Sequence, residues 1–169
     1  MDNNIKYKFA QYPNKIFIET GSGYGIGIKE ALKVGVFEKI YSIEKNRQLY
    51  EYCSNIFAPD LNVEIIYGSS IDILPGLLSF INNECTFWLD AHKSKEEPVP
   101  LLDELKIIAS HRVKTHTLLI DDMRLVGKKD YWKKLSIEEI EAEVLKINPQ
   151  YQITYEYGVE PNDILIAHV

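Results

Sequence analysis

Hydrophobic and polar residues alternate along this chain in blocks of two kinds. Short runs rich in β-branched and aromatic residues have the composition of buried strands. Five such runs occur, at residues 15–19, 39–43, 62–67, 86–90 and 117–121. Between them, apolar residues recur at helical spacing in four longer segments, at residues 25–34, 46–57, 71–82 and 101–111. This alternation is typical of βαβ units, and it predicts five parallel strands with helices on both faces of the sheet.

The pattern changes after the fifth predicted strand. Ser136 and Glu139 form a capping box, which predicts a helix that ends before Pro149. Residues 152–157 and 164–168 then have strand composition and flank a turn-rich segment, so we expect an antiparallel hairpin. Parallel strands followed by a terminal hairpin indicate a Rossmann-like, doubly wound α/β fold. The length of 169 residues fits a single domain spanning residues 1–169.

Composition narrows the class of protein. The chain is 46% apolar and 26% charged, as in ordinary globular domains, and its net charge of −6 argues against unspecific binding to polymeric nucleic acid. Cys53 and Cys85 are far apart and lack metal-binding spacing, which fits a reducing compartment. Residues 1–11 are polar, and no apolar run approaches the roughly 20 residues of a membrane span. We therefore expect a cytoplasmic protein that neither enters a membrane nor is secreted.

A glycine-rich loop joins the first strand to the first helix, with the sequence Glu-Thr-Gly-Ser-Gly-Tyr-Gly at residues 19–25. Glycines at such a junction allow a close backbone approach to a ligand, and the helix N-terminus adds N–H donors. The loop predicts a nucleotide-like ligand, and a purely structural turn is the alternative interpretation. Dinucleotide-binding enzymes favour G-x-G-x-x-G, which requires glycine where this chain has Ile26.

An acidic residue two positions before G-x-G-x-G resembles motif I of the class I S-adenosylmethionine-dependent methyltransferases. This resemblance implies that S-adenosylmethionine is the cofactor and that Glu19 anchors its methionine end. It implies that the following loop residues lie along the body of the cofactor. These residues are Thr20, Gly21, Ser22, Gly23 and Gly25.

Two further positions are candidates for the nucleoside of the cofactor. Glu44 closes the second strand about 20 residues after the loop, where its paired oxygens can accept both ribose hydroxyls. The alternative is a carboxylate that only stabilises the start of a helix. Ser69 and Ser70 open the third helix, where the resemblance places the adenine edge. Many family members have Asp or Asn at position 69, and Asp72 is a candidate substitute here.

Acidic residues follow the fourth and fifth predicted strands, at the edge of the sheet where ligands of open α/β folds bind. Buried carboxylates need a cation, a proton or hydrogen-bond donors nearby. One explanation is a divalent cation held by Asp90, Asp121 and Asp122, which would lower the pKa of a substrate hydroxyl. With Lys93 as base, this set resembles metal-dependent catechol and caffeoyl-CoA O-methyltransferases, whose third ligand is usually Asn. The other explanation is metal-free, with Asp90 or His92 as general base.

The phrases FWLDAHKS, PLLDELKII and TLLIDDMRLVG also resemble an uncharacterised group of methyltransferase-like proteins of bacteria and viruses. In that group the fourth strand more often ends in Asp-Gly-His-Tyr. The chain lacks Asn-Pro-Pro-Tyr, Asp-Pro-Pro-Tyr and Pro-Cys motifs, which argues against methylation of nucleic-acid bases.

A basic and aromatic cluster follows the fifth strand. It indicates either an anionic acceptor or an ordinary solvated loop. Its members are Arg124, Lys128, Lys129, Tyr131, Trp132, Lys133 and Lys134. In contrast, His111, His116 and His168 lack ligand spacing and are predicted to be structural.

These observations predict methyl transfer from S-adenosylmethionine to an oxygen or nitrogen of a small, anionic acceptor. Asp90, His92 and Asp121 are the candidate catalytic residues, Asp90 also lies near the cofactor, and catalysis would rest largely on alignment. The main alternative is a non-catalytic cofactor-binding or scaffold module in an oligomer. A homo-oligomer would also supply a wall of the acceptor pocket that a short chain lacks. An oxidoreductase is disfavoured by Ile26 and by the terminal hairpin.

Overall fold

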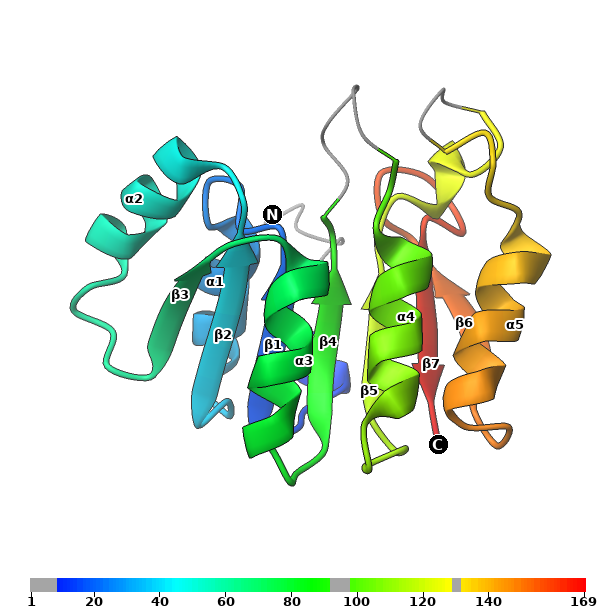
Figure 1. Cartoon of the computed structure of the whole chain (residues 1–169), viewed down its shortest axis with the longest axis horizontal. Coiled ribbons are helices and arrows are strands. Elements are labelled where there is room, and N and C mark those ends of the chain that lie inside the picture. The colour runs from blue at the N-terminus through cyan, green and yellow to red at the C-terminus, as the bar shows by residue number, and fades with distance from the viewer. Residues whose placement is uncertain (1–8, 92–97, 129–131) are drawn as a thin grey trace.

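The computed structural model describes residues 9–91, 98–128 and 132–169, and within them one mixed sheet forms the centre of the molecule (Figure 1). The strand order is β3-β2-β1-β4-β5-β7-β6. The strands are β1 (Ile16–Thr20), β2 (Lys39–Glu44), β3 (Val63–Tyr67), β4 (Cys85–Leu89), β5 (Thr117–Ile120), β6 (Gln152–Glu156) and β7 (Ile164–His168). Strands β1 to β5 are parallel, whereas β7 lies between β5 and β6 and is antiparallel to both. The predicted parallel sheet and terminal hairpin are confirmed.

Helices cover both faces of this sheet, as the alternating pattern predicted. They are α1 (Ile26–Val34), α2 (Arg47–Ile56), α3 (Ser70–Phe80), α4 (Leu101–Ser110) and α5 (Ile137–Ile147), with short 3₁₀ turns η1 (Phe9–Gln11) and η2 (Met123–Leu125). Helices α3, α4 and α5 lie on the near face in Figure 1 and contribute to one hydrophobic core. Residues of η1, α1 and α2 form the second core on the far face.

Strand β4 shows why the central strands are apolar along their whole length. All five of its residues are buried. Phe87 and Leu89 pack into the core beneath α3 and α4, while Trp88 packs into the opposite core beside Phe9. A strand covered on both faces needs apolar residues at every position, so alternation disappears.

Local sequence also determines where the helices begin and end. The Asn46 side chain accepts hydrogen bonds from the N–H groups of Gln48 and Leu49, which caps α2. The Ser136 hydroxyl accepts one from the N–H of Glu139, as the predicted capping box requires. Helix α1 ends at Gly35, whose φ of 71° is in the left-handed region that favours glycine.

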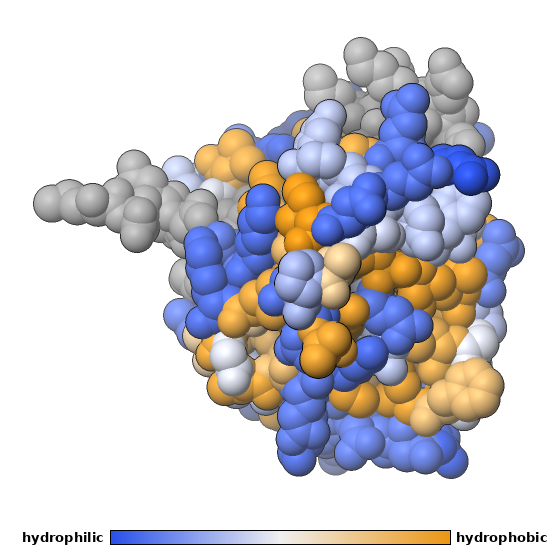
Figure 2. All heavy atoms as spheres, turned by 90° about the vertical axis from the view of Figure 1, so that its left-hand side faces the viewer, coloured by the Kyte–Doolittle hydropathy of each residue, from blue (hydrophilic) through white to orange (hydrophobic). Residues whose placement is uncertain are grey.

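Strand β3 forms one edge of the sheet, and α2 lies beside it. Figure 2 views this side of the molecule, where apolar side chains lie between polar ones. Leu61 is 94% exposed, and Ile56 and Tyr67 are also exposed. Within the described residues, no helix is both long and apolar enough to cross a lipid bilayer.

Candidate functional site

The glycine loop lies against two neighbouring strands at the carboxyl edge of the sheet. Gly21, Gly23 and Gly25 have φ angles of 86°, 52° and 73°, which are left-handed conformations that favour glycine. A Cβ at Gly21 would lie 2.6 Å from the carbonyl oxygen of Asp90. Glycine is therefore required for both the shape of this loop and its close approach to the end of β4.

Glu19 lies beneath the loop and is 1% exposed. Its carboxylate accepts a hydrogen bond from the Ser42 hydroxyl, and Ser42 is also hydrogen-bonded to the Ser22 hydroxyl at 2.6 Å. A Cβ at Gly27 would overlap the Glu19 carboxylate. This geometry lets Glu19 support the loop from below, and its contact with the methionine end of a cofactor stays a prediction.

Sequence reasoning missed Ser42 and Gly27. The signal for Gly27 was present, since Gly21, Gly23, Gly25 and Gly27 form an alternating series. The pairing of β1 with β2, which places Ser42 opposite Glu19, is a long-range feature that no local motif announces.

Glu44 lies at the end of β2 and is 6% exposed. One carboxylate oxygen accepts the Gly23 N–H at 2.9 Å, and the other accepts the Asn46 N–H at 2.8 Å. A carboxylate oxygen can accept more than one hydrogen bond, so both oxygens retain capacity for the hydroxyls of a ribose. The position predicted for the ribose-binding carboxylate is therefore beside the glycine loop.

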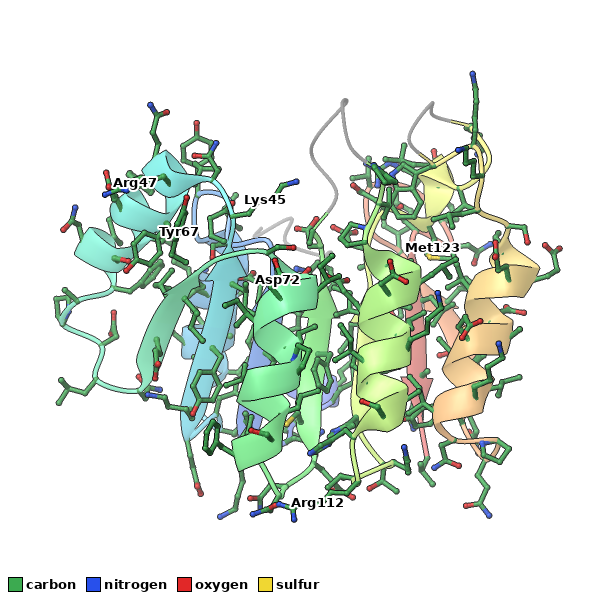
Figure 3. All side chains as sticks on the ribbon, viewed as in Figure 1. Lys45, Arg47, Tyr67, Asp72, Arg112 and Met123 are labelled. Carbon is green, nitrogen blue, oxygen red and sulfur yellow. The ribbon has the colours of Figure 1, made fainter. Side chains whose placement is uncertain are left out.

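The predicted adenine-side residues lie at the same edge of the sheet. Ser69 is the N-cap residue of α3, but its side chain accepts no capping hydrogen bond from the helix N–H groups, and Ser70 is buried. Asp72 lies in the exposed first turn of α3, and Figure 3 shows it near the edge where Lys45 and Tyr67 also lie. These positions are compatible with contacts to an adenine ring, which stay predictions.

The acidic residues after β4 and β5 come together as expected. Asp90, Asp121 and Asp122 are all buried, and one carboxylate oxygen of each lies within 4.8 Å of the others. The Asp90 N–H donates to the Thr20 carbonyl at 3.0 Å, so this acidic cluster adjoins the base of the glycine loop. His92 and Lys93 lie outside the described residues.

Arg124 offsets part of the negative charge at this edge. Its guanidinium forms ion pairs with Asp122 and with Asp163, the latter at 2.7 Å, and Asp163 is fully buried. Burial lowers the pKa of Arg124, but the hydrogen bonds that its guanidinium donates to Asp163 and Asp122 outweigh this effect and raise the pKa above its usual value. Arg124 is thus held by two carboxylates of the protein.

This finding changes the interpretation of the basic and aromatic cluster. Arg124 is already paired, and Trp132 is fully buried in the core, so it offers no exposed ring for stacking. Lys129 and Tyr131 lie outside the described residues. The hypothesis of an anionic acceptor therefore loses Arg124 and Trp132 as support.

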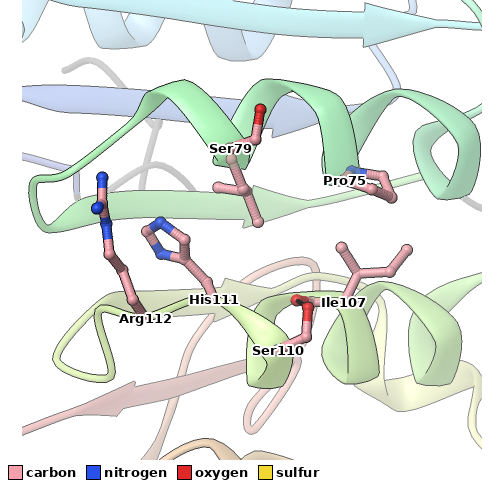
Figure 4. A pocket seen from close by; sticks show the side chains of 7 residues that line it. Pro75, Ser79, Ile107, Ser110, His111 and Arg112 are labelled. Carbon is pink, nitrogen blue, oxygen red and sulfur yellow. Dashed lines mark hydrogen bonds between the residues drawn. The ribbon is translucent and has the colours of Figure 1, made fainter.

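The opposite edge of the sheet carries a histidine pair. The Cys85 N–H donates to His116 Nδ1 at 3.0 Å, His116 Nε2 lies 2.8 Å from His111 Nδ1, and His111 Nε2 lies 3.0 Å from the Ile81 carbonyl oxygen. Beside this pair, α3 and α4 form an open groove of about 350 Å³ (Figure 4). Because α4 leads into the start of β5, the groove lies at the amino ends of the strands, away from the glycine loop. The structural role predicted for His111 and His116 fits these contacts.

The strand order, the glycine loop and the carboxylate at the end of β2 belong to a Rossmann-like α/β fold, which this chain shares with solved structures of methyltransferases. No family model matches the sequence, and no curated protein matches it.

Solved structures share the fold at low sequence identity. Spermidine synthase from Thermotoga maritima superposes with a TM-score of 0.67 at 14% identity, covering 97% of this chain and 57% of its own. A proposed methyltransferase from Streptococcus mutans, in complex with SAH, superposes with a TM-score of 0.58 at 16% identity, and the match covers 95% of this chain and 93% of that protein. The SAH-bound methyltransferase PaMTH1 from Podospora anserina superposes with a TM-score of 0.61 at 12% identity, and the match covers 91% of this chain and 71% of that protein. The chain thus spans little more than half of the spermidine synthase but nearly all of the Streptococcus protein.

Proposed function

We propose that this protein is an S-adenosylmethionine-dependent methyltransferase acting on an oxygen or nitrogen of a small acceptor. The observation that carries the proposal is the buried Glu44 carboxylate, hydrogen-bonded to Gly23 in a loop of three left-handed glycines. That arrangement offers a carboxylate for the ribose and an open backbone path for the rest of the cofactor. The two SAH-bound structures of the same fold support the same ligand.

The residues divide into a cofactor side and an acceptor side. Glu44 would accept the ribose hydroxyls, Ser69, Ser70 and Asp72 would lie near the adenine, and the loop from Thr20 to Gly25 would lie along the methionine end. The acidic cluster after β4 and β5 would lie on the acceptor side of the bound cofactor, which would supply the methyl group. Asp90 or Asp121, with His92 as a further candidate, would take the proton of the acceptor, and S-adenosylhomocysteine would be the leaving group of the in-line methyl transfer.

The acidic cluster also fits a divalent cation. Oxygen ligands around Ca²⁺ lie at most about 5 Å apart, and the three carboxylates meet this condition. Asp90, Asp121 and Asp122 would hold such an ion, which when bound would stabilise a deprotonated acceptor oxygen. Arg124 forms an ion pair with Asp122, so one cation of the protein already offsets part of the charge of the cluster.

An anionic acceptor is a narrower version of this proposal. It would be held by Lys128, Lys133 and Lys134, which follow the acidic cluster in sequence. The proposal also includes a homo-oligomer, because β3 is an edge strand of the sheet in the described residues and the exposed side chains of Ile56 and Leu61 flank it.

Calorimetry of the wild-type protein with S-adenosylmethionine, S-adenosylhomocysteine and NAD is the first test. Binding of the first two without NAD supports the cofactor assignment, and transfer of a labelled methyl group to small hydroxyl or amine acceptors then supports the reaction. Binding without transfer to any acceptor favours the non-catalytic module. Binding of NAD alone would overturn the proposal in favour of an oxidoreductase.

A further inference from the structure

The glycine loop is joined to the end of β2 by hydrogen bonds from three consecutive residues. The bonds are Gly21 N–H to Ile43 O at 2.8 Å, Ser22 Oγ to Ser42 Oγ at 2.6 Å, and Gly23 N–H to Glu44 Oε2 at 2.9 Å. The first uses only backbone atoms and does not depend on side-chain identity. The third depends entirely on the Glu44 carboxylate.

Gly23 is held from both sides. Its N–H donates to Glu44, and its carbonyl oxygen accepts a hydrogen bond from the Cys53 thiol at 3.4 Å. Burial, together with the charges of Glu19 and Glu44, raises the pKa of Cys53 to about 11, so the thiol keeps its proton at neutral pH. The other oxygen of Glu44 binds the Asn46 N–H, which ties the carboxylate to the capping residue of α2.

We propose that Glu44 is a positioning residue that holds the glycine loop in its cofactor-binding shape before any cofactor arrives. This positioning role is additional to the proposed contact between Glu44 and the ribose. Its second test, which measures ligand affinity, rests on the proposed function. A loop that is already ordered loses less conformational entropy when a ligand binds, so the hydrogen bond to Gly23 contributes to affinity without touching the ligand.

Glutamine at position 44 provides a sharp test because it keeps size and shape but changes hydrogen-bonding capacity. A carboxylate presents acceptors to both the Gly23 and the Asn46 N–H groups. A carboxamide presents one acceptor and one NH₂ group, so one of the two backbone donors must lose its partner. Glu44→Asp keeps the charge but shortens the side chain by one methylene, and it serves as a second variant that retains a buried carboxylate.

The first experiment is amide hydrogen exchange at Gly23 in the protein without cofactor, followed by NMR. Glu44→Gln and Glu44→Asp are expected to accelerate this exchange by about tenfold or more, because a hydrogen bond to a charged acceptor is lost or weakened. Glu64→Gln is the matched control, since Glu64 lies on the neighbouring strand β3 and is exposed. Exchange at Gly23 that stays at the wild-type rate in both Glu44 variants overturns the proposal.

The second experiment is a cycle that combines Glu44→Gln with removal of the ribose hydroxyls from the ligand. Affinities are measured for S-adenosylhomocysteine and for its 2′,3′-dideoxy analogue. If Glu44 acts only on the ribose, the substitution leaves the affinity for the dideoxy analogue unchanged, which overturns the proposal. The expected result is about tenfold weaker binding of the analogue as well.

The two experiments separate this inference from the function on which it rests. A wild-type protein that binds neither ligand would overturn the proposed function, while the exchange rate of Gly23 still decides whether Glu44 holds the loop. Exchange of core amides in β4, at Phe87 for example, shows whether a variant remains folded. Faster amide exchange confined to the glycine loop supports the proposal. If the amides of β4 exchange faster to the same extent as those of the loop in both variants, the proposal is overturned.

Discussion

Gly27 lies in the first turn of α1, where any side chain would collide with the carboxylate of Glu19. The carboxylate is held in place by the Ser42 hydroxyl and is almost completely buried, so it has little room to move. A glycine in a helix normally lowers stability by roughly 0.5–1 kcal/mol relative to alanine. At this position, the need for space outweighs the intrinsic preference for alanine.

Gly27→Ala is therefore expected to lower the free energy of unfolding by about 2 kcal/mol or more, through overpacking against Glu19. Gly76 provides the matched control, because it lies inside α3 with open space around it. Gly76→Ala should raise the free energy of unfolding by about 0.5–1 kcal/mol. Urea denaturation of both variants measures the two effects, and a stabilised Gly27→Ala would contradict the assigned contact.

At the scale of single residues, prediction from sequence worked where a motif is local. Gly21, Gly23 and Gly25 follow one another in the chain, and their left-handed conformations confirm the predicted loop. The roles of Ser42 and Arg124 depend on strand pairing and on a partner 39 residues away, Asp163. Such contacts are set by the tertiary fold, and local pattern carries no information about them.

The histidine pair connects four elements at the amino edge of the sheet: the end of α3, the start of β4, the end of α4 and the segment before β5. Since the Cys85 N–H donates to His116 Nδ1, the proton of neutral His116 lies on Nε2 and points to His111. Protonation of His116 would place a second N–H against that of Cys85. The pair is therefore built for neutral imidazoles.

This arrangement predicts a loss of stability at acidic pH. Burial, followed by the charges of His111 and Lys114, lowers the pKa of His116 to about 4. The unfolded chain, with a histidine pKa near 6.5, binds the proton more tightly, so stability is fully present above pH 6.5 and is lost as pH falls toward 4. The expected loss is on the order of 3 kcal/mol.

Denaturation of the wild type and of His116→Asn across this pH range tests the prediction. Asparagine keeps an acceptor for the Cys85 N–H but does not titrate, so the variant should be less stable at neutral pH and should show a shallower pH dependence. His168→Asn, at a half-buried position near the C-terminus, is the matched control for the removal of one histidine. A His116→Asn variant with an unchanged slope would show that other groups cause the acid sensitivity.

Arg124 joins η2, after β5, to the turn between β6 and β7. The Asp163 carboxylate also accepts hydrogen bonds from the backbone N–H groups of Arg124 and Val159. The turn between β6 and β7 is therefore organised around this buried carboxylate. Arg124→Gln leaves Asp122 and Asp163 without their shared cation and should lower the free energy of unfolding by about 3 kcal/mol. Lys128→Gln, at an exposed position nearby, should change it by less than about 0.5 kcal/mol. Thermal unfolding of the two variants measures the difference, and equal values would rule out the proposed role of the ion pair.

At the scale of elements, the sequence predicted the type and approximate bounds of all five helices and seven strands in the described residues. The fourth strand ends at Leu89, one residue earlier than predicted, which leaves Asp90 just beyond the sheet. The strand order was not predicted, because insertion of β7 between β5 and β6 brings together segments separated by α5. The periodicity of hydrophobic residues indicates which residues are buried, but it does not indicate which strands are neighbours in the sheet.

For the whole molecule, the net charge of −6 affects any test of a metal site. Divalent cations screen an acidic protein and raise its stability without a specific site. A bound cation instead stabilises the fold according to its own dissociation constant, by about 2.7 kcal/mol when its concentration is a hundred times that constant. Screening and specific binding are separated by comparing a substitution in the acidic cluster with a substitution that removes the same charge elsewhere on the protein.

Asp121→Asn and Asp103→Asn provide that comparison. Both remove one negative charge, but Asp121 is fully buried in the acidic cluster, whereas Asp103 lies exposed on α4 and pairs with Lys106. If Asp90, Asp121 and Asp122 hold a cation, millimolar Ca²⁺ or Mg²⁺ should raise the melting temperature of the wild type and of Asp103→Asn at constant ionic strength. Asp121→Asn should lose that increase, and EDTA should reverse it in the other two proteins. An equal increase in all three would assign the effect to screening, and methyl transfer would then depend on Asp90 or His92 acting as a general base without a metal.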